Sequence, residues 1–197
     1  MCYGANFLPL ARQFRCEKII YLTFDDGPNP IHSNRIMDLL AQYDIKVTFF
    51  IVGSNVEKHM DTATRMVKEG HVLGNHTYTH KLLPCIPRAE KIQEIQKCQE
   101  LIESLQNSKN KIFRPPQGLI NLADLIYLYR KNYSIMLWSI DSNDYHLSGD
   151  IESRLRELPK SHYVILFHDD NAFCIDSLVN LLPIWIEQGF QFAIPKL

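Results

Sequence analysis

Two adjacent aspartates, Asp25 and Asp26, end an apolar run in the stretch "LTFDDGPNP" of residues 22–30. Neighbouring carboxylates raise each other's proton affinity, so such a pair is costly unless a cation or a reaction uses it. His76 and His80 are four residues apart in "NHTYTH". In a helical turn that spacing would place both imidazoles on one side, able to share a metal with one carboxylate. Two histidines and one carboxylate leave open positions for water and substrate, which is typical of a catalytic metal site.

Three further motifs carry polar side chains that would complete such a site. They are "RPPQG" with Arg114, "WSIDSNDY" with Asp141 and Asp144, and "ILFHDD" with His168. The aspartate that does not bind the metal would act as a base toward water, and Arg114 would keep it ionised. His168 would protonate a leaving group, with Asp144 orienting it and keeping it cationic. The alternatives are a surface ion pair for Arg114 and a buried structural histidine for His168.

Short β-branched and aromatic runs alternate with helical patterns along the chain. The predicted strands cover residues 19–24, 47–52, 71–75, 111–114, 134–139, 163–167 and 191–194. This alternation predicts parallel pairing through right-handed crossovers, and a closed or nearly closed α/β barrel fits it better than an open sheet. Each polar motif follows a predicted strand. In an α/β barrel the carboxyl ends of the strands share one face, so the motifs are expected to meet there.

The helical patterns carry start and stop signals. Ser33 is the predicted N-cap of the first helix, and Gly70 the stop of the second. Later helices are predicted over residues 88–106, 122–131, 151–158 and 175–188. Several side chains outside the motifs are given structural roles: Trp138 and Trp185 in the core, Tyr127, Tyr129 and Tyr133 in packing, and Asp169 and Asp170 in a loop.

Composition limits the classes of partner. The 197-residue chain has a net charge of −1 and no basic block, which argues against nucleic acid or an anionic membrane as its main partner. No apolar stretch approaches the roughly 18 residues of a membrane span. The N-terminus does not resemble a signal peptide, so the protein is expected to be cytoplasmic or a trimmed form of an exported one. The pattern predicts an N-terminal extension over residues 1–18 and one catalytic domain over 19–197.

The five cysteines form no CxxC pair. Free thiols in a reducing compartment are one interpretation, and a disulfide among Cys2, Cys16 and Cys174 in an exported protein is the other. The sequence does not indicate an oligomeric state.

Together the motifs resemble those of the polysaccharide deacetylases of carbohydrate esterase family 4, which share the domain named after NodB. "TFDDG", "HTYTH", "RPPQG", "DSNDY" and "LFHD" follow one another in the family's order, and the resemblance covers residues from about 19 to 194. The family fold is a distorted (β/α) barrel with about seven strands. The resemblance therefore implies an α/β fold of the (β/α)7, TIM-barrel-like type.

The resemblance also implies roles for individual residues. The implied catalytic residues are Asp25 as general base, His168 as general acid, Arg114 beside the base and Asp144 beside the acid. The implied ligands of one divalent metal ion are Asp26, His76 and His80. Zinc is the expected metal, with cobalt or another ion as an alternative. Leu166 would line the pocket for an acetyl methyl group. The implied reaction removes N-acetyl groups from glycans that contain N-acetylglucosamine, by attack of a metal-bound water.

Two positions depart from the family pattern. Gln117 stands where the family commonly has tyrosine or phenylalanine, and its backbone N–H is the implied donor to the oxyanion. Tyr145 stands where a tryptophan commonly helps to wall the sugar site. These departures keep open a degenerate domain that binds glycans without turnover. An esterase for O-acetylated xylan is a second alternative, because the sequence does not indicate which glycan is used. A two-metal phosphoesterase would need more ligands and more cationic residues than the motifs provide.

Overall fold

The computed structural model describes residues 17–107, 111–145 and 151–195 of the chain. Its strands are β1 (Lys18–Asp25), β2 (Thr48–Ile51), β3 (Val72–Asn75), β4 (Ile112–Phe113), β5 (Ser134–Ile135), β6 (Ile140–Asp141), β7 (His162–His168) and β8 (Phe190–Phe192). Its α-helices are α1 (His32–Ala41), α2 (Gly53–Lys58), α3 (Met60–Lys68), α4 (Arg88–Gln106), α5 (Leu122–Arg130), α6 (Ile151–Leu155) and α7 (Phe173–Glu187). Two short 3-10 helices, Leu83–Cys85 and Pro116–Gly118, lie in the loops.

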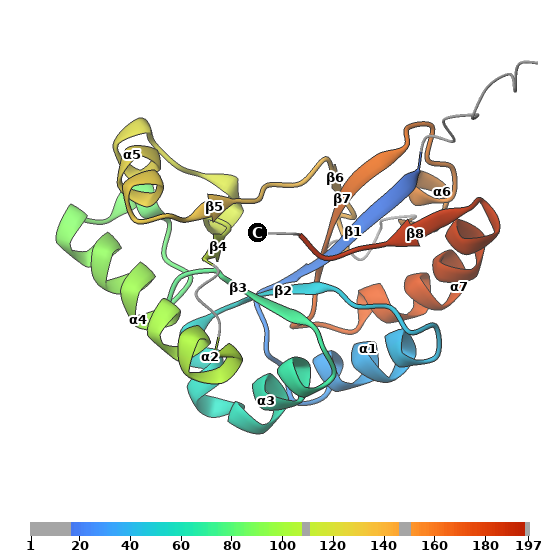
Figure 1. Ribbon diagram of the computed structural model, residues 1–197, viewed down its shortest axis with the longest axis horizontal. Helices are drawn as coiled ribbons and strands as arrows, with labels where there is room; N and C mark the ends of the chain where they lie inside the picture. Colours follow the sequence, from blue (N-terminus) through green and yellow to red (C-terminus); the bar gives the residue numbers. More distant parts are fainter. Residues whose placement is uncertain (1–16, 108–110, 146–150, 196–197) are drawn as a thin grey trace, which may run out of the picture.

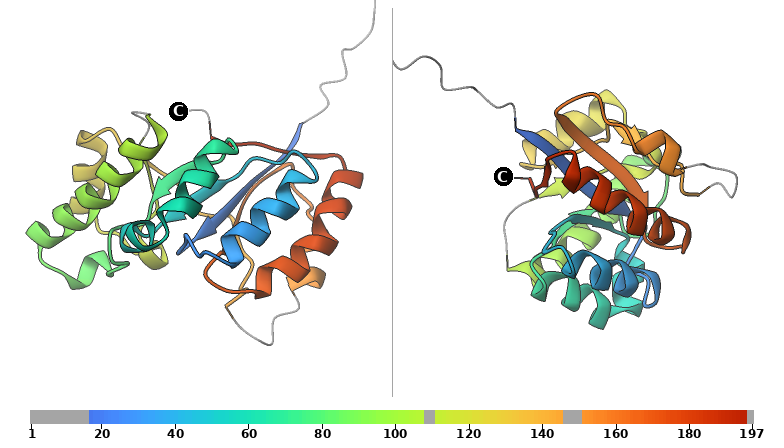
Figure 2. Two further views of the ribbon diagram at one scale, coloured as in Figure 1. Left: turned by 90° about the horizontal axis from the view of Figure 1, so that it is seen from below. Right: turned by 90° about the vertical axis from the view of Figure 1, so that its right-hand side faces the viewer.

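The described strands form one parallel sheet in the order β5-β4-β3-β2-β1-β7-β6. Strand β1 pairs with β7 along one edge. Along its other edge, the start of β1 pairs with β8 and the end of β1 pairs with β2. The sheet is curled, and α1, α3, α4 and α7 form an arc around its outside (Figure 1). The view from below places these helices in front of the strands (Figure 2). The predicted distorted α/β barrel is confirmed.

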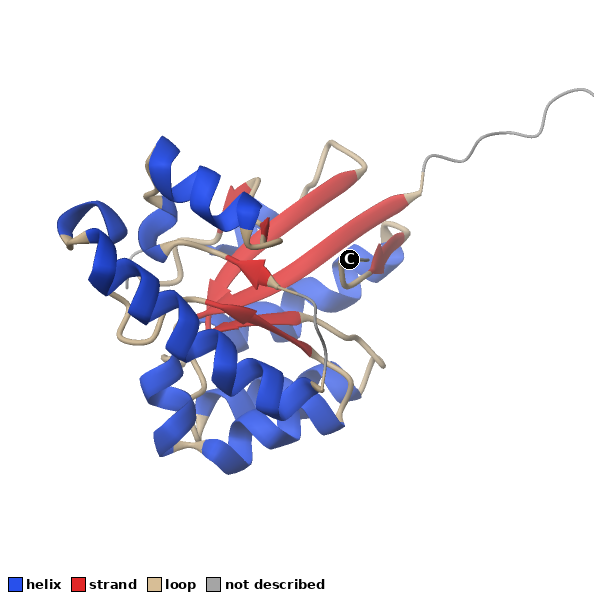
Figure 3. Cartoon of the chain, turned by 60° about the vertical axis from the view of Figure 1, so that its left-hand side comes forward, coloured by secondary structure: helices blue, strands red, loops and turns tan. Residues whose placement is uncertain are grey.

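The prediction of one continuous fifth strand over residues 134–139 is wrong, because the curled sheet is interrupted there. β5 pairs with β4, whereas β6 pairs with β7 on the far side of the sheet. Figure 3 shows the two long strands of the sheet together with its shorter ones. Two backbone carbonyls of the connecting segment accept hydrogen bonds from a side chain. The carbonyls of Met136 and Leu137 accept hydrogen bonds from Arg114, at 2.8 Å from Nε and 3.5 Å from Nη2.

The two faces of β1 have different environments because its side chains alternate. Ile20, Leu22 and Phe24 point into the main core. There the ring of Phe24 stacks at 5.3 Å on Phe49 and at 6.0 Å on Phe167. Thr23 and Asp25 lie on the opposite face, inside the curl. Trp185 is fully buried, as predicted, and its indole N–H donates to the Leu155 carbonyl.

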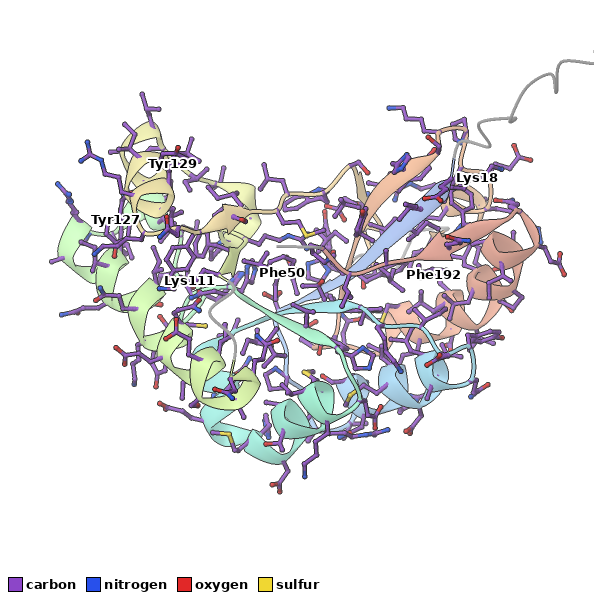
Figure 4. The ribbon with its side chains drawn as sticks, viewed as in Figure 1. Lys18, Phe50, Lys111, Tyr127, Tyr129 and Phe192 are labelled. Carbon is purple, nitrogen blue, oxygen red and sulfur yellow. The ribbon has the colours of Figure 1, made fainter. Side chains whose placement is uncertain are left out.

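Two of the predicted local roles are wrong. Ser33 lies inside α1, and the N–H groups of Ile31 and His32 are accepted by the side-chain oxygen of Asn29. The Ser33 hydroxyl instead faces Asp169, a contact that sequence spacing could not indicate. Tyr129 does not pack, since it is 81% exposed on α5 (Figure 4). The predicted stop at Gly70 is confirmed, with φ of +87°.

Some predictions lie outside the described residues. The N-terminal extension over residues 1–18 falls there except for its last two residues, as do Cys2 and Cys16 of the proposed disulfide. Cys174 is described, and it is a buried free thiol. None of the described helices combines the length and the apolar composition that crossing a membrane requires.

Candidate active site

The polar motifs converge at the carboxyl ends of the strands. A cleft of about 430 Å³ opens there, and eight of the ten predicted site residues line it. The other two, Arg114 and Asp144, are fully buried and each contacts a residue that lines the cleft. The prediction that strand ends bring these motifs together is therefore confirmed. The parallel topology is the cause, because every motif follows a strand of the same direction.

The first unit of the site is a buried ion pair between Asp25 and Arg114. Arg114 Nη1 donates to Asp25 Oδ1 at 2.7 Å and to Thr23 Oγ1 at 2.9 Å. The guanidinium carbon lies 4.0 Å from the ring centre of Phe50 and 5.6 Å from that of Trp138. Figure 4 places Phe50 in the middle of the molecule. These contacts leave Arg114 no freedom to rotate away, so it holds one carboxylate oxygen of Asp25 in a fixed position.

Burial controls the proton affinity of this pair. It raises the pKa of the Asp25 carboxyl, and the neighbouring charge of Arg114 offsets only part of that rise. Burial likewise lowers the pKa of Arg114, against the attraction of Asp25. Both shifts oppose ionisation, so the pair is not a strong source of stability. It would nevertheless be costly to break, because one partner would remain as an unpaired buried charge.

We therefore expect Arg114→Met to lower the free energy of unfolding by about 3–5 kcal/mol at pH 7, measured by urea denaturation. The matched control is Arg65→Met. Arg65 binds Asp38 and Glu69 near the surface, where the loss should stay below about 1 kcal/mol. Equal losses in the two variants would contradict the special cost of the buried pair.

The second unit is a group of three residues that could hold a metal ion. Ligand atoms of Asp26, His76 and His80 all lie within 4.8 Å of one another. Asp26 Oδ1 is 3.1 Å from His80 Nε2 and 3.5 Å from His76 Nε2. This oxygen is buried and has no hydrogen-bond partner among the described residues. A buried carboxylate oxygen facing two imidazole nitrogens fits a divalent cation, which would satisfy all three atoms.

The tautomer of His76 supports the same interpretation. Its Nδ1 lies 2.7 Å from the backbone carbonyl of Arg114, which can only accept a hydrogen bond, so Nδ1 carries the proton. Nε2 is therefore the lone-pair nitrogen, and it is the atom that faces the aspartates. Burial lowers the pKa of His76 to about 3, which keeps the ring in the neutral form that binds metals.

The loop that carries His76 and His80 is not the predicted helical turn. Thr77 and His80 have φ of +68° and +59°, in the left-handed region. Bonds from neighbouring elements impose this shape: the side chain of Asn75 accepts the Thr77 N–H, and Glu94 of α4 accepts both the N–H and the hydroxyl of Thr79. The two imidazole rings still lie 4.9 Å apart. The predicted proximity is thus confirmed although its predicted cause is wrong.

The third unit pairs His168 with Asp144. His168 Nδ1 lies 2.7 Å from Asp144 Oδ1, and the His168 backbone N–H donates to Asp144 Oδ2 at 2.8 Å. Burial alone would lower the pKa of His168. The hydrogen bond and charge of Asp144, helped by the charges of Asp26 and Asp25, outweigh burial and raise that pKa to about 9. His168 is therefore a protonated imidazole at neutral pH, with its Nδ1 engaged.

The remaining predicted residues form the walls of the cleft. Gln117 has φ of +54°, and Leu166 of β7 is nearly fully buried. Tyr145 is half-exposed, and its ring meets that of His168 edge-on at 5.5 Å. Asp141, whose role the sequence left open, also lines the cleft. The backbone of Gln117 is therefore left-handed, which costs about 1–3 kcal/mol at a residue other than glycine and tends to persist at functional sites.

Three residues that the sequence analysis assigned to other roles lie in or beneath the site, and one of them, Asp170, lines the cleft. Trp138 is not in the core but lines the cleft, because the break between β5 and β6 turns it inward. Asp169 is not an ordinary loop residue, since it is fully buried and burial raises its pKa to about 7. Its position directly after His168 was the available signal, because successive side chains at a strand end point in opposite directions.

Comparison with known proteins agrees with this geometry. The sequence profile described as polysaccharide deacetylase matches residues 13–132. The peptidoglycan-N-acetylmuramic acid deacetylase PdaC of Bacillus subtilis is 34% identical over 179 residues, which cover 90% of this chain and 38% of PdaC. A peptidoglycan-N-acetylglucosamine deacetylase of Bacillus cereus is also 34% identical, over 90% of this chain and 86% of that protein. The chain thus spans less than half the length of PdaC and most of the second relative.

Solved structures show the same fold. The structure of PdaC matches with a TM-score of 0.81 and 33% identity, over 89% of this chain and 87% of that one. The Bc1960 peptidoglycan N-acetylglucosamine deacetylase matches with a TM-score of 0.84 and 32% identity, over 90% and 85% of the two chains. On its motifs, its fold and these matches, the chain belongs to the polysaccharide deacetylase family.

Proposed function

We propose that the chain is a metal-dependent hydrolase that removes N-acetyl groups from N-acetylglucosamine residues of a glycan, of the peptidoglycan or chitooligosaccharide type. The observation that carries the proposal is the convergence of three units on one cleft: the Asp25–Arg114 pair, the potential metal-binding group and the His168–Asp144 pair. Membership of the polysaccharide deacetylase family supports it, as do the relatives named for peptidoglycan deacetylation.

Asp26, His76 and His80 would hold one divalent ion, with zinc as the first expectation and cobalt or another ion as alternatives. When bound, such an ion supplies Lewis acidity toward the amide carbonyl and lowers the pKa of water. The protein's part is to keep His76 neutral and to leave Asp26 Oδ1 without a competing hydrogen bond.

Asp25 is proposed as the general base. Arg114 occupies its Oδ1, so Oδ2 is the atom that would take a proton from the attacking water. Oδ2 lies 3.6 Å from His76 Nε2, which places it next to the proposed metal site. The raised pKa of Asp25 makes it a stronger base than an exposed carboxylate, while Arg114 limits that rise.

His168 is proposed as the general acid. Its Nδ1–H is committed to Asp144, so Nε2–H would donate to the amine nitrogen as the carbon–nitrogen bond breaks. The water oxygen forms the new bond to the acetyl carbon, and the products are acetate and a free amine. In keeping with the family pattern, the Gln117 backbone N–H would donate to the oxyanion and Leu166 would contact the acetyl methyl.

The lining of the cleft favours an uncharged sugar. Among the described residues that line it there is no lysine or arginine, whereas Asp141 and Asp170 both face it. Apart from the catalytic His168 and the proposed metal ion, the carboxylate of a muramic acid unit would meet these acids without a compensating cation, whereas N-acetylglucosamine has no such group. Trp138 and Tyr145 offer aromatic surface against which a sugar ring would pack.

Acetate release from N-acetylglucosamine oligomers and from peptidoglycan tests the proposal, with chelated protein and with zinc or cobalt restored. We expect release from at least one substrate only when metal is present. O-acetylated xylan, assayed in parallel, tests the esterase alternative. Metal-loaded protein that releases no acetate from either N-acetylated substrate would contradict the proposed function.

The Asp144–His168 pair predicts a specific pH dependence. The acid form of His168 is needed, so activity should fall as pH rises through its pKa. Asp144→Asn removes the charge that holds this pKa near 9, and burial would then lower it. We expect the basic limb of the kcat/KM profile to move down by about 1–3 pH units, alongside a lower maximum. An unchanged basic limb in metal-loaded Asp144→Asn would rule out His168 as the acid.

A further inference from the structure

We propose that Asp169 is a positioning residue that, together with Ser33, fixes the metal ligand Asp26 and the base Asp25 in place. The inference rests on the proposed metal site. Asp169 follows His168 directly and is 0% exposed, so it lies beneath the site and not in the cleft. Its backbone N–H donates to the Asp25 carbonyl at 3.1 Å, which ties the end of β7 to the end of β1.

The side chain of Asp169 packs directly on Gly27, the residue after Asp26. A Cβ built on Gly27 would lie 2.1 and 2.3 Å from the two carboxylate oxygens, far inside van der Waals contact. Gly27 does not have the left-handed backbone that would by itself require glycine. Gly27 is therefore needed because a larger side chain would overlap the Asp169 carboxylate.

Ser33 connects the carboxylate to the turn that follows Gly27. The Ser33 hydroxyl donates to Asp169 Oδ2, and the same hydroxyl oxygen accepts the backbone N–H of Asn29 at 2.7 Å. Both Ser33 and Asp169 are fully buried. The side-chain amide of Asn29 also donates to the carbonyl of Asp170 at 3.3 Å. These bonds join the segment after β7 to the turn after β1 on the buried side of the site.

Asp26 needs such support because its backbone is strained, with φ of +77°. On its other side it is held by Asn55, whose side chain donates to the Asp26 carbonyl at 2.9 Å, and by the Asp26 N–H bond to the Phe50 carbonyl. Asp169 supplies a packing contact at Gly27, the residue that follows Asp26. Without it, the turn could relax and Asp26 would lose its position opposite the two histidines.

The test is the metal affinity of the folded protein, measured for zinc and cobalt by competition with a chelating dye. We expect Asp169→Ala to weaken metal binding by about 10–100-fold, as loss of a group that supports a metal ligand does. Asp169→Asn keeps the shape and an acceptor for Ser33, so it should recover most of the affinity. Ser33→Ala should weaken binding in the same direction by less. Asp176→Ala, which removes an exposed carboxylate of α7, is the control.

A merely structural role for Asp169 would lower thermal stability without changing the metal affinity of the folded fraction. Folded Asp169→Ala that binds zinc and cobalt like the wild type would therefore overturn the proposal. If that variant does not fold, wild-type affinity in folded Ser33→Ala overturns it instead. Wild-type protein that binds metal but releases no acetate would refute the proposed function alone, whereas wild-type protein that binds no metal would refute both.

Discussion

Asp25→Asn is expected to lower kcat for acetate release by about 10²–10⁴-fold, the usual contribution of a general base. The reason is that the amide cannot take a proton from water, although it has nearly the same shape as the carboxylate. Its oxygen can still accept the Arg114 hydrogen bond that now holds Oδ1. The loss should therefore appear in kcat, with metal affinity and the KM for the glycan close to those of the wild type.

The comparison needs protein loaded with the same amount of metal, because Asp25 lies close to His76. Metal content measured on the assayed sample provides this control. If metal-loaded Asp25→Asn kept the full rate, the assigned base would be wrong. If it lost metal instead, Asp25 would be acting as a ligand.

His76→Ala is the second variant with a large expected effect. It removes the ligand atom Nε2 from a group in which the other two members are only partly buried. We expect metal affinity to fall by more than the roughly 100-fold typical for groups that only support a ligand. Turnover at a metal concentration that saturates the wild type should fall to that of the chelated protein.

His71→Ala is the matched control for this substitution. His71 is also buried, beside β3, and its Nδ1 accepts the Val47 N–H, yet it does not line the cleft. Both variants should lose stability because each removes a buried ring. Only His76→Ala should lose metal binding. Equal metal affinity in the two variants would contradict the assignment of His76.

Much of this site could be predicted from the sequence because the residue types and the strand topology act together. The runs of β-branched and aromatic residues indicated where strands end, and parallel pairing then brought Asp25, His76, Arg114 and His168 to one face. The alternation of strand patterns with helical patterns predicted the fold class. Helix α4, predicted over residues 88–106, has those bounds in the structure.

What could not be predicted depends on contacts between distant residues. The left-handed loop at Thr77 is set by Glu94 and Asn75, not by a local helical preference. The split of the predicted fifth strand follows from Arg114 taking the carbonyls of Met136 and Leu137. Trp138 enters the cleft through that split. Buried polar side chains such as Arg114 override local propensity because their hydrogen bonds must be satisfied.

The most direct test of the central claim is a stoichiometric titration of chelated protein with zinc on N-acetylglucosamine oligomers. Acetate and free amine would be measured in the same samples as metal is added back. We expect both products to rise together, one for one, and to reach a plateau at about one bound metal ion per chain. No rise in either product after metal has bound, or product formation independent of bound metal, would contradict the account.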